Sequence, residues 1–245
     1  MKPGIQVSSL KPLLKTEEQM RIAFCHMAAL DAPFLQLQWI DPAVPVDAIA
    51  DAMRSNGQKS LGTQDFYVTV LENLEYYVNL NAATGGIWLT VSRIPERCKS
   101  REGLDVFARE LTELQARLTP LGQRVCFHPV TADFTAVPGM NAVEYLLETL
   151  PWLEICLDLF HLDKNCDDMP RFIRRYAGRI PMVHFKDHRN GVLVPAGQGQ
   201  VRWEGVMEAC RDAEVGYGLA EQETWDSDPY GCLGQALAWI RKEAL

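Results

Sequence analysis

The chain has 245 residues, of which 47% are hydrophobic and 23% are charged, a composition typical of a globular protein with a sizeable core. A net charge of −8 argues against a protein that binds nucleic acid or anionic membranes. No apolar run reaches the length of a membrane-spanning helix, and the first residues lack the apolar block of a signal peptide. Seven scattered cysteines without a C-x-x-C pair predict reduced thiols, so we expect a cytoplasmic protein.

Short apolar runs alternate with segments of helical period along the whole chain. The runs predict strands at 4–10, 34–40, 58–65, 86–94, 123–130, 153–162, 180–187 and 217–223. The periodic segments predict helices at 16–30, 45–57, 66–86, 101–122, 141–151, 167–178, 201–213 and 229–245. Because a helix follows each strand as a crossover, we expect the strands to pair in parallel.

Eight strand–helix units in a chain of this length predict an α/β fold, a closed (β/α)8 TIM barrel that forms one domain over residues 1–245. A doubly wound open sheet is the alternative. That fold more often carries a glycine-rich fingerprint after its first strand, and the segment "SSLKPLLK" shows none. The sequence therefore favours the barrel.

Polar groups gather late in the last four predicted strands. In chain order they are His128; Asp158 and His161; His184, Lys186 and Asp187; and Glu221 and Glu223. Active sites of TIM barrels lie at the C-terminal ends of the strands, so these side chains are expected on one face of the molecule. Alternation along the strand places His184 and Lys186 on the same side, the expected barrel interior, and Asp187 on the other.

A shared divalent cation explains these buried polar groups together. Asp158 is flanked by leucines in "CLDLF", where a lone carboxylate is costly to desolvate. Ligation by Asp158, His184, Glu221 and a group from strand 123–130 would compensate these costs, and mixed imidazole and carboxylate ligands suit Mn²⁺, Zn²⁺, Co²⁺ or Fe²⁺ rather than Ca²⁺. The alternative is that each histidine is a hydrogen-bonded core residue and that Asp158 pairs with Lys186.

Several segments resemble the xylose isomerase-like TIM-barrel superfamily, in its sugar phosphate isomerase/epimerase branch. "GIQVSSLKPLL" is similar to the opening strand G-x-Q-x-x-S-L-R, and "LDLFHL" to a D-x-x-H element. "GRIPMVHFKDH" is close to R-I-x-x-x-H-x-K-D, "AGQGQVRW" resembles the loop G-x-G-x-x-x-W, and "LAEQETWDSDP" resembles a final E-Q-D segment. The resemblance covers nearly the whole chain, and the histidine strand with the G-x-G-x-x-x-W loop is its most specific part.

The resemblance implies that Asp158, His184 and Glu221 ligate a divalent metal. It further implies that His161 contacts substrate oxygens and that Lys186 and Asp187 support the site. Relatives carry Y-H-N-H-x-x-E-F in strand five, whereas this chain reads "FHPVTADF", with Val130 at the second histidine and Asp133 at the glutamate. His128 is thus the expected fourth ligand, and Asp133 is the alternative fourth ligand.

The resemblance implies a metal-dependent enzyme that isomerises or epimerises a small sugar, sugar phosphate or cyclitol by abstracting a proton next to a carbonyl. We expect catalytic roles for Glu221, His184, Lys186 and His128, and substrate contacts from a second set: His161, Asp187, Asp133 and Glu223. Because strand five lacks the glutamate of two-base epimerases, isomerisation or dehydration fits better than epimerisation. A dehydratase of the inosose or dehydroshikimate kind is therefore the first alternative.

Two further alternatives come from other classes of protein. An endonuclease-IV-like repair enzyme needs more ligands and a basic DNA face, which five histidines and a charge of −8 disfavour. A metal-free binding barrel would follow if strand five had lost its ligand. The loop 189–200 either closes over a polyol, presents backbone amides to a phosphate, or is a plain connector, and Trp203 is expected to anchor it. Trp39 is expected to pack in the core, with an apolar wall against a sugar ring as the alternative. A homo-oligomer is left open.

Overall fold

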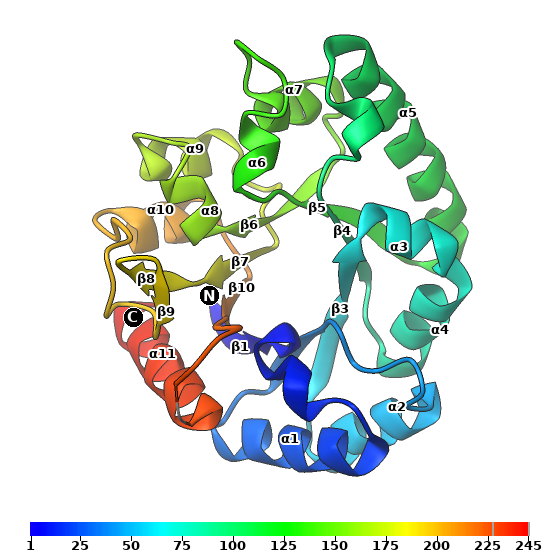
Figure 1. Cartoon of the computed structure of the whole chain (residues 1–245), viewed down its shortest axis with the longest axis vertical. Coiled ribbons are helices and arrows are strands. Elements are labelled where there is room, and N and C mark those ends of the chain that lie inside the picture. The colour runs from blue at the N-terminus through cyan, green and yellow to red at the C-terminus, as the bar shows by residue number, and fades with distance from the viewer. Residues whose placement is uncertain (227, 245) are drawn as a thin grey trace.

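The computed structural model describes residues 1–226 and 228–244, and in this part of the chain eight parallel strands close into a barrel (Figure 1). Around the barrel the strands follow the order β1-β10-β7-β6-β5-β4-β3-β2. Their bounds are β1 (Lys2–Gln6), β2 (Phe34–Leu37), β3 (Lys59–Phe66), β4 (Trp88–Ser92), β5 (Arg124–His128), β6 (Glu154–Asp158), β7 (Met182–Phe185) and β10 (Tyr217–Ala220). The closed parallel barrel is confirmed, and the open sheet is excluded.

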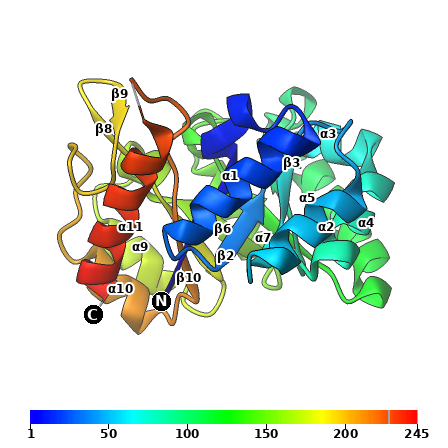
Figure 2. The same ribbon diagram turned by 90° about the horizontal axis from the view of Figure 1, so that it is seen from below.

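Helices surround the barrel on the outside (Figures 1 and 2). The α-helices are α1 (Glu17–Ala29), α2 (Val46–Ser55), α3 (Tyr67–Glu72), α4 (Leu74–Thr84), α5 (Arg101–Leu118), α6 (Thr131–Phe134), α7 (Ala142–Thr149), α8 (Leu159–Asp163), α9 (Met169–Arg175), α10 (Val206–Asp212) and α11 (Pro229–Ala244). Three 3-10 turns add η1 (Val7–Leu13), η2 (Glu96–Cys98) and η3 (Thr119–Leu121). No described helix has the length and apolarity needed to cross a membrane. Leu245, which ends the predicted helix 229–245, lies outside the described residues.

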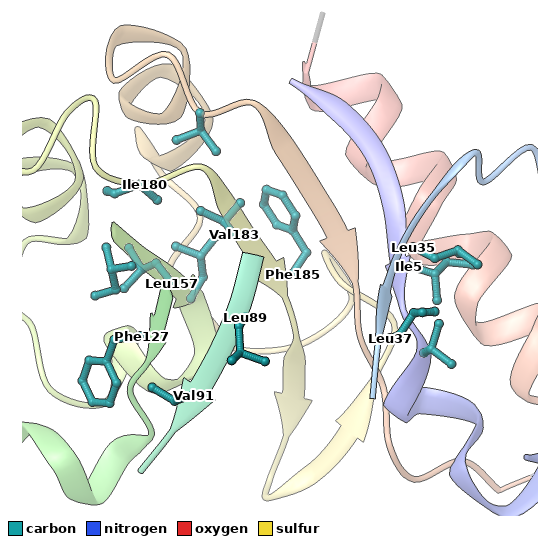
Figure 3. Close-up of a cluster of buried hydrophobic side chains, with 14 of the residues drawn as sticks. Ile5, Leu35, Leu37, Leu89, Val91, Phe127, Leu157, Ile180, Val183 and Phe185 are labelled. Carbon is teal, nitrogen blue, oxygen red and sulfur yellow. The ribbon is translucent and has the colours of Figure 1, made fainter. Parts of the chain in front are cut away.

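The main hydrophobic core lies between the barrel and its helices. Alternate residues of each strand point outward and are fully or nearly fully buried there, among them Leu89, Phe127, Leu157, Val183 and Phe185 (Figure 3). Because side chains in a strand alternate between the two faces, the residues between these point into the barrel.

The barrel interior is divided into two layers. The lower layer is apolar and consists of Leu61, Trp88, Cys126, Cys156, Met182 and Leu219. Two residues further along several of these strands, the inward positions become polar, as Cys126 gives way to His128, Cys156 to Asp158 and Met182 to His184. Strand register places Asp158 beside His184, and Ser92 beside His128. The polar layer is therefore assembled at the C-terminal ends of the strands.

Two predicted strands end earlier than expected because a helix begins inside them. The strand predicted at 153–162 stops at Asp158, whose carboxylate caps α8 by accepting the backbone N–H groups of Phe160 and His161. The strand predicted at 4–10 stops at Gln6, and η1 follows directly. Apolar composition alone does not distinguish a buried strand from a short buried helix, which explains both errors.

Two further segments differ from expectation. The helix predicted at 66–86 is two helices, α3 and α4, that break at Asn73, where the backbone is not helical (φ −128°, ψ 30°). The loop at 189–200 contains an antiparallel hairpin with β8 (Asp187–Arg189) and β9 (Val192–Val194). Its turn residues Asn190 and Gly191 have φ of 52° and 85°, as a two-residue Asn-Gly turn requires. Figure 2 shows this hairpin at the end of the barrel opposite to the N-terminus.

Candidate metal centre and active site

Four buried side chains bring one potential ligand atom each to a common point at the top of the barrel. His128, Asp158, His184 and Glu221 lie on β5, β6, β7 and just after β10, and their ligand atoms are all within 4.8 Å of one another. His128 Nε2, Asp158 Oδ2, His184 Nδ1 and Glu221 Oε2 are also buried without a hydrogen-bond partner in the structure. An unpaired buried polar atom costs about 1 to 3 kcal/mol, so four at one point fit a bound cation.

The ring of His184 is oriented by a hydrogen bond on the side away from this point. Its Nε2 lies 2.6 Å from Oε1 of Gln36, which can only accept, so Nε2 carries the proton. Gln36 is held in turn by Gln6 and by Thr90, each at 3.1 Å. The other ring nitrogen, Nδ1, then presents a lone pair 3.0 Å from Oε2 of Glu221, the arrangement expected of a metal-binding histidine.

The two carboxylates are each fixed through one oxygen and present the other. Asp158 uses Oδ1 for the cap of α8, at 2.9 Å from the Phe160 nitrogen, which leaves Oδ2 for the centre. Glu221 accepts a hydrogen bond at 3.1 Å from the hydroxyl of Ser8 through Oε1, which leaves Oε2. Although burial alone would raise the pKa of Glu221, the positive charge of Lys186 lowers it well below its ordinary value, so this carboxylate is charged.

His128 completes the group as a neutral imidazole. Its Nδ1 lies 3.2 Å from the hydroxyl of Ser92, and its Nε2 lies 4.0 Å from Oδ2 of Asp158. Burial and the neighbouring His184 lower the pKa of His128 to about 3. A neutral imidazole with one unpartnered nitrogen has the protonation state that a metal ligand needs.

Lys186 lies among three carboxylates at the edge of the group. Its Nζ is 2.6 Å from Oε2 of Glu223 and 3.7 Å from both Asp158 Oδ2 and Glu221 Oε2. Burial alone would lower the pKa of Lys186, but Glu221 and two further carboxylates raise it above the ordinary value. Burial and then Glu221 raise the pKa of Glu223. Lys186 is therefore a fixed positive charge beside the expected ligands.

A cavity of about 780 Å³ opens above the group. Of the predicted site residues, His128, Asp133, His161, Lys186, Glu221 and Glu223 line it. His161 lies next to the four expected ligands, with Nε2 3.6 Å from Asp158 Oδ2 and Nδ1 2.8 Å from the hydroxyl of Thr131. The cavity volume lies within the range of about 300 to 1,000 Å³ that is usual for small-molecule pockets.

Asp133, the alternative fourth ligand, lies outside the group of four. One of its oxygens accepts the backbone N–H of Ile94 at 2.9 Å, and the other accepts that of Val130 at 2.8 Å. Burial raises the pKa of Asp133 to about 6. The structure thus gives Asp133 a different contact: it ties the segment after β4 to the segment after β5.

Asp187 points away from the cavity, as strand alternation predicts. Its carboxylate accepts six hydrogen bonds, from the Trp203 indole and from the backbone nitrogens of His188, Gly197, Gly199, Gln200 and Val201. A Cβ on Gly199 would lie 2.1 Å from Asp187 Oδ1, which explains the second glycine of G-x-G-x-x-x-W. Trp203 anchors the loop as predicted, and α10 begins at Val206 rather than at 201 because this anchored loop precedes it. The position of Asp187 favours loop support over substrate contact.

Sequence reasoning did not identify the residues that orient the expected ligands. Gln36, Ser8 and Ser92 hydrogen-bond to three of the four, and each lies within two residues of the end of a strand from the first half of the chain. A polar residue at an inward position of an otherwise buried strand was the available signal. Trp39 lines the cavity and contacts Phe66, which fits the alternative of an apolar wall better than packing in the core.

A family profile described as xylose isomerase-like TIM barrel matches residues 67–243. The chain belongs to this family. The expected resemblance is confirmed at that level. No curated protein sequence matches the chain.

Solved structures with the same fold include several sugar-converting enzymes. An L-ribulose 3-epimerase is 15% identical with a TM-score of 0.81, over 100% of this chain and 95% of that one. A sugar phosphate isomerase/epimerase from Parabacteroides distasonis is 13% identical with a TM-score of 0.80, over 99% and 93%. A D-allulose 3-epimerase from Methylomonas sp., in complex with D-allulose, is 14% identical with a TM-score of 0.75, over 99% and 97%. At such low identity the likeness shows the fold alone.

Proposed function

We propose that the chain is a divalent-metal-dependent enzyme that isomerises or epimerises a small sugar or sugar phosphate by removing a proton next to a carbonyl. The observation that carries this proposal is the set of four buried ligand atoms without a hydrogen-bond partner, from His128, Asp158, His184 and Glu221, of which His128 and Glu221 line the cavity. Family membership and the sugar epimerases among the structural neighbours support the same class of substrate.

The metal would be held by these four side chains, and Mn²⁺, Zn²⁺, Co²⁺ and Fe²⁺ are the candidates for a mixed imidazole and carboxylate set. When bound, it would supply Lewis acidity that polarises a substrate carbonyl. Gln36 keeps the proton of His184 on Nε2, and the cap of α8 keeps Asp158 in place. These partners prepare the site before any ligand enters.

In the proposed reaction the chain's own groups move the proton. Glu221, which lines the cavity as a charged carboxylate, removes the proton from the carbon next to the carbonyl, and the electron pair of that C–H bond moves toward the carbonyl oxygen. Lys186, a fixed cation that also lines the cavity, stabilises the negative charge that develops on that oxygen. His161 and Glu223 line the same cavity and are proposed to contact substrate hydroxyl groups.

One feature favours proton transfer on a single face of the substrate. Of the carboxylates close to Lys186, Asp158 ends β6 and the other two follow β10, with β7 between these strands. Asp133, after β5, is occupied by two backbone N–H groups. Delivering a proton from Glu221 to the former carbonyl carbon on the same face, while the hydroxyl proton of the neighbouring carbon passes to the former carbonyl oxygen, gives a 1,2-isomer. Expelling a neighbouring hydroxide instead gives dehydration, so a dehydratase is the second candidate.

The experiment that tests this proposal follows solvent hydrogen exchange. The purified protein is stripped with a chelator, reloaded separately with each candidate metal, and incubated in D2O with a panel of ketoses that includes L-ribulose and D-allulose. Mass spectrometry then reports deuterium incorporation, isomerised product, or loss of water. We expect metal-dependent incorporation into at least one sugar; its absence with every metal and sugar, together with unchanged metal content after Asp158→Asn, would favour a metal-free binding barrel.

A further inference from the structure

Two bulky residues with strained backbone border the cavity. Trp39, just after β2, has φ of 58°, and Arg93, just after β4, has φ of 68°, and both line the cavity. Large side chains seldom adopt this left-handed region, which costs about 1 to 3 kcal/mol and is often associated with functional sites. The other non-glycine residues with positive φ among those described are the turn residues Asp31, Asn190 and Glu214. Strain in bulky residues is therefore concentrated at the cavity.

Trp39 and Arg93 belong to a row of stacked aromatic and cationic side chains. The guanidinium carbon of Arg93 lies 4.2 Å from the centre of the Phe66 ring, and the Phe66 ring meets that of Trp39 edge-on at 6.1 Å. Lys11 Nζ lies 4.2 Å from the centre of the Trp39 ring. We name Trp39, Phe66 and Arg93 the aromatic wall; all three line the cavity, on the half formed by β1 to β4.

Among the described residues that line the cavity, Arg93 is the cation that forms no ion pair within 4.0 Å. Among the described lining residues, Lys186 contacts three carboxylates and Lys99 lies 2.6 Å from Glu96. Arg93 makes no described ion pair within 4.0 Å, and its side chain is exposed against the Phe66 face. A guanidinium that is stacked on a ring keeps its N–H fork in a fixed plane, which suits two parallel hydrogen bonds to a carboxylate or a phosphate.

We propose that Arg93 binds an anionic group, a carboxylate or a phosphate, at the end of the substrate remote from the four expected metal ligands. Trp39 and Phe66 would pack against the apolar face of the carbon chain between the two ends. This inference rests on the proposed function and narrows its substrate class to sugar acids or sugar phosphates. The cavity of about 780 Å³ has space for such an extension.

The test compares three ketoses that differ only at carbon 6: D-fructose, D-fructose 6-phosphate and D-fructuronate. Calorimetric titration of the metal-loaded protein gives the affinity for each. We expect at least one charged ketose to bind about 10- to 100-fold more tightly than D-fructose, the range for a hydrogen bond to a charged group. Which of the two binds more tightly identifies the anion as phosphate or carboxylate.

Three variants assign the preference to Arg93. Arg93→Gln should bring the three affinities to within about twofold of one another, whereas Arg117→Gln, an exposed arginine on α5, should preserve the preference. Arg93→Gly should equalise the affinities as well, with a melting temperature equal to or above that of the wild type, because glycine relieves the positive φ. Arg93→Gly therefore distinguishes loss of the ligand contact from loss of the fold.

Two outcomes would overturn the inference. The first is that neither charged ketose binds more tightly than D-fructose to the wild type. The second is that Arg93→Gln weakens all three ketoses by the same factor or leaves the preference intact. The proposed function fails independently: an Arg93-dependent preference without deuterium exchange into any sugar would retain the anion site and reject the enzyme.

Discussion

The two halves of the barrel rim are built for different tasks. The half formed by β5, β6, β7 and β10 carries the four expected metal ligands, all buried, and their outer sides are held by hydrogen bonds. The half formed by β1 to β4 carries the aromatic wall, whose side chains contact one another and are not expected metal ligands. Two of its residues have a strained backbone with positive φ. The difference indicates that one half is organised for chemistry at a fixed point, and the other for recognition of what extends from it.

The largest effect is expected from removing a charge from the ligand half. Asp158→Asn keeps an oxygen that can cap α8 but replaces the carboxylate with a neutral amide, so metal affinity should fall by more than about 100-fold, and deuterium exchange with it. Asp168→Asn, at the N-cap of α9, is the matched control because it makes the same change outside the cavity. Equal metal affinity in the two variants would contradict the assignment of the centre.

A second prediction concerns the dependence of one half on the other. Gln36→Leu removes the acceptor on β2 that orients His184 across the barrel, so metal affinity should fall about 10- to 100-fold, as is typical when a residue that orients a metal ligand is lost. Gln123→Leu is the control, since Gln123 is also buried and hydrogen-bonded, to Val78 and Asn81, but lies away from the centre. A loss of stability in both variants with metal affinity lost in neither would show that Gln36 is only structural.

A third prediction tests whether Asp187 supports the loop or belongs to the site. Asp187→Asn removes the charge that six donors share, so the free energy of unfolding should fall by about 2 to 4 kcal/mol in chemical denaturation. Because Asp187 faces the loop and not the cavity, metal affinity should change less than about threefold. A large change in metal affinity with normal stability would place Asp187 in the site after all.

The smallest effect is expected on stability as a function of pH, and it concerns Asp133. This residue lies between the two halves and joins the segments after β4 and β5. Burial raises the pKa of Asp133 to about 6, so the folded chain retains this proton between pH 4 and 6 while the unfolded chain releases it. Stability should therefore decline as pH rises through this window, by at most about 3 kcal/mol. Asp133→Asn should remove that decline and leave metal affinity unchanged; loss of metal would instead make Asp133 a ligand.

Much of the fold could be predicted because the strand–helix rhythm repeats eight times and admits few topologies. The four expected ligands could be named because each lies at or just after the C-terminal end of a strand, and a closed barrel brings those strand ends together. Element ends were less predictable: Asp158 both ends a strand and caps a helix, and the sequence does not show which role dominates. The Asn190-Gly191 turn, by contrast, was a readable hairpin signal.

Of the aromatic wall, Trp39 was an alternative candidate for a sugar-facing position, but Phe66 and Arg93 could not be predicted from the sequence, for a physical reason. Trp39 and Arg93 lie 54 positions apart, and nothing in their local sequence marks the positive φ that turns them toward the cavity. Their stacking on Phe66 arises only when β2, β3 and β4 pair side by side. Such contacts depend on backbone conformation and strand register, and the local residue pattern does not determine either.

Anomalous scattering from a crystal of the protein loaded with Mn²⁺ tests the central claim most directly. We predict one strong peak at the floor of the cavity, with His128 Nε2, Asp158 Oδ2, His184 Nδ1 and Glu221 Oε2 all in its coordination sphere. A peak elsewhere, or no peak at full Mn²⁺ concentration with these four side chains still in place, would contradict the account.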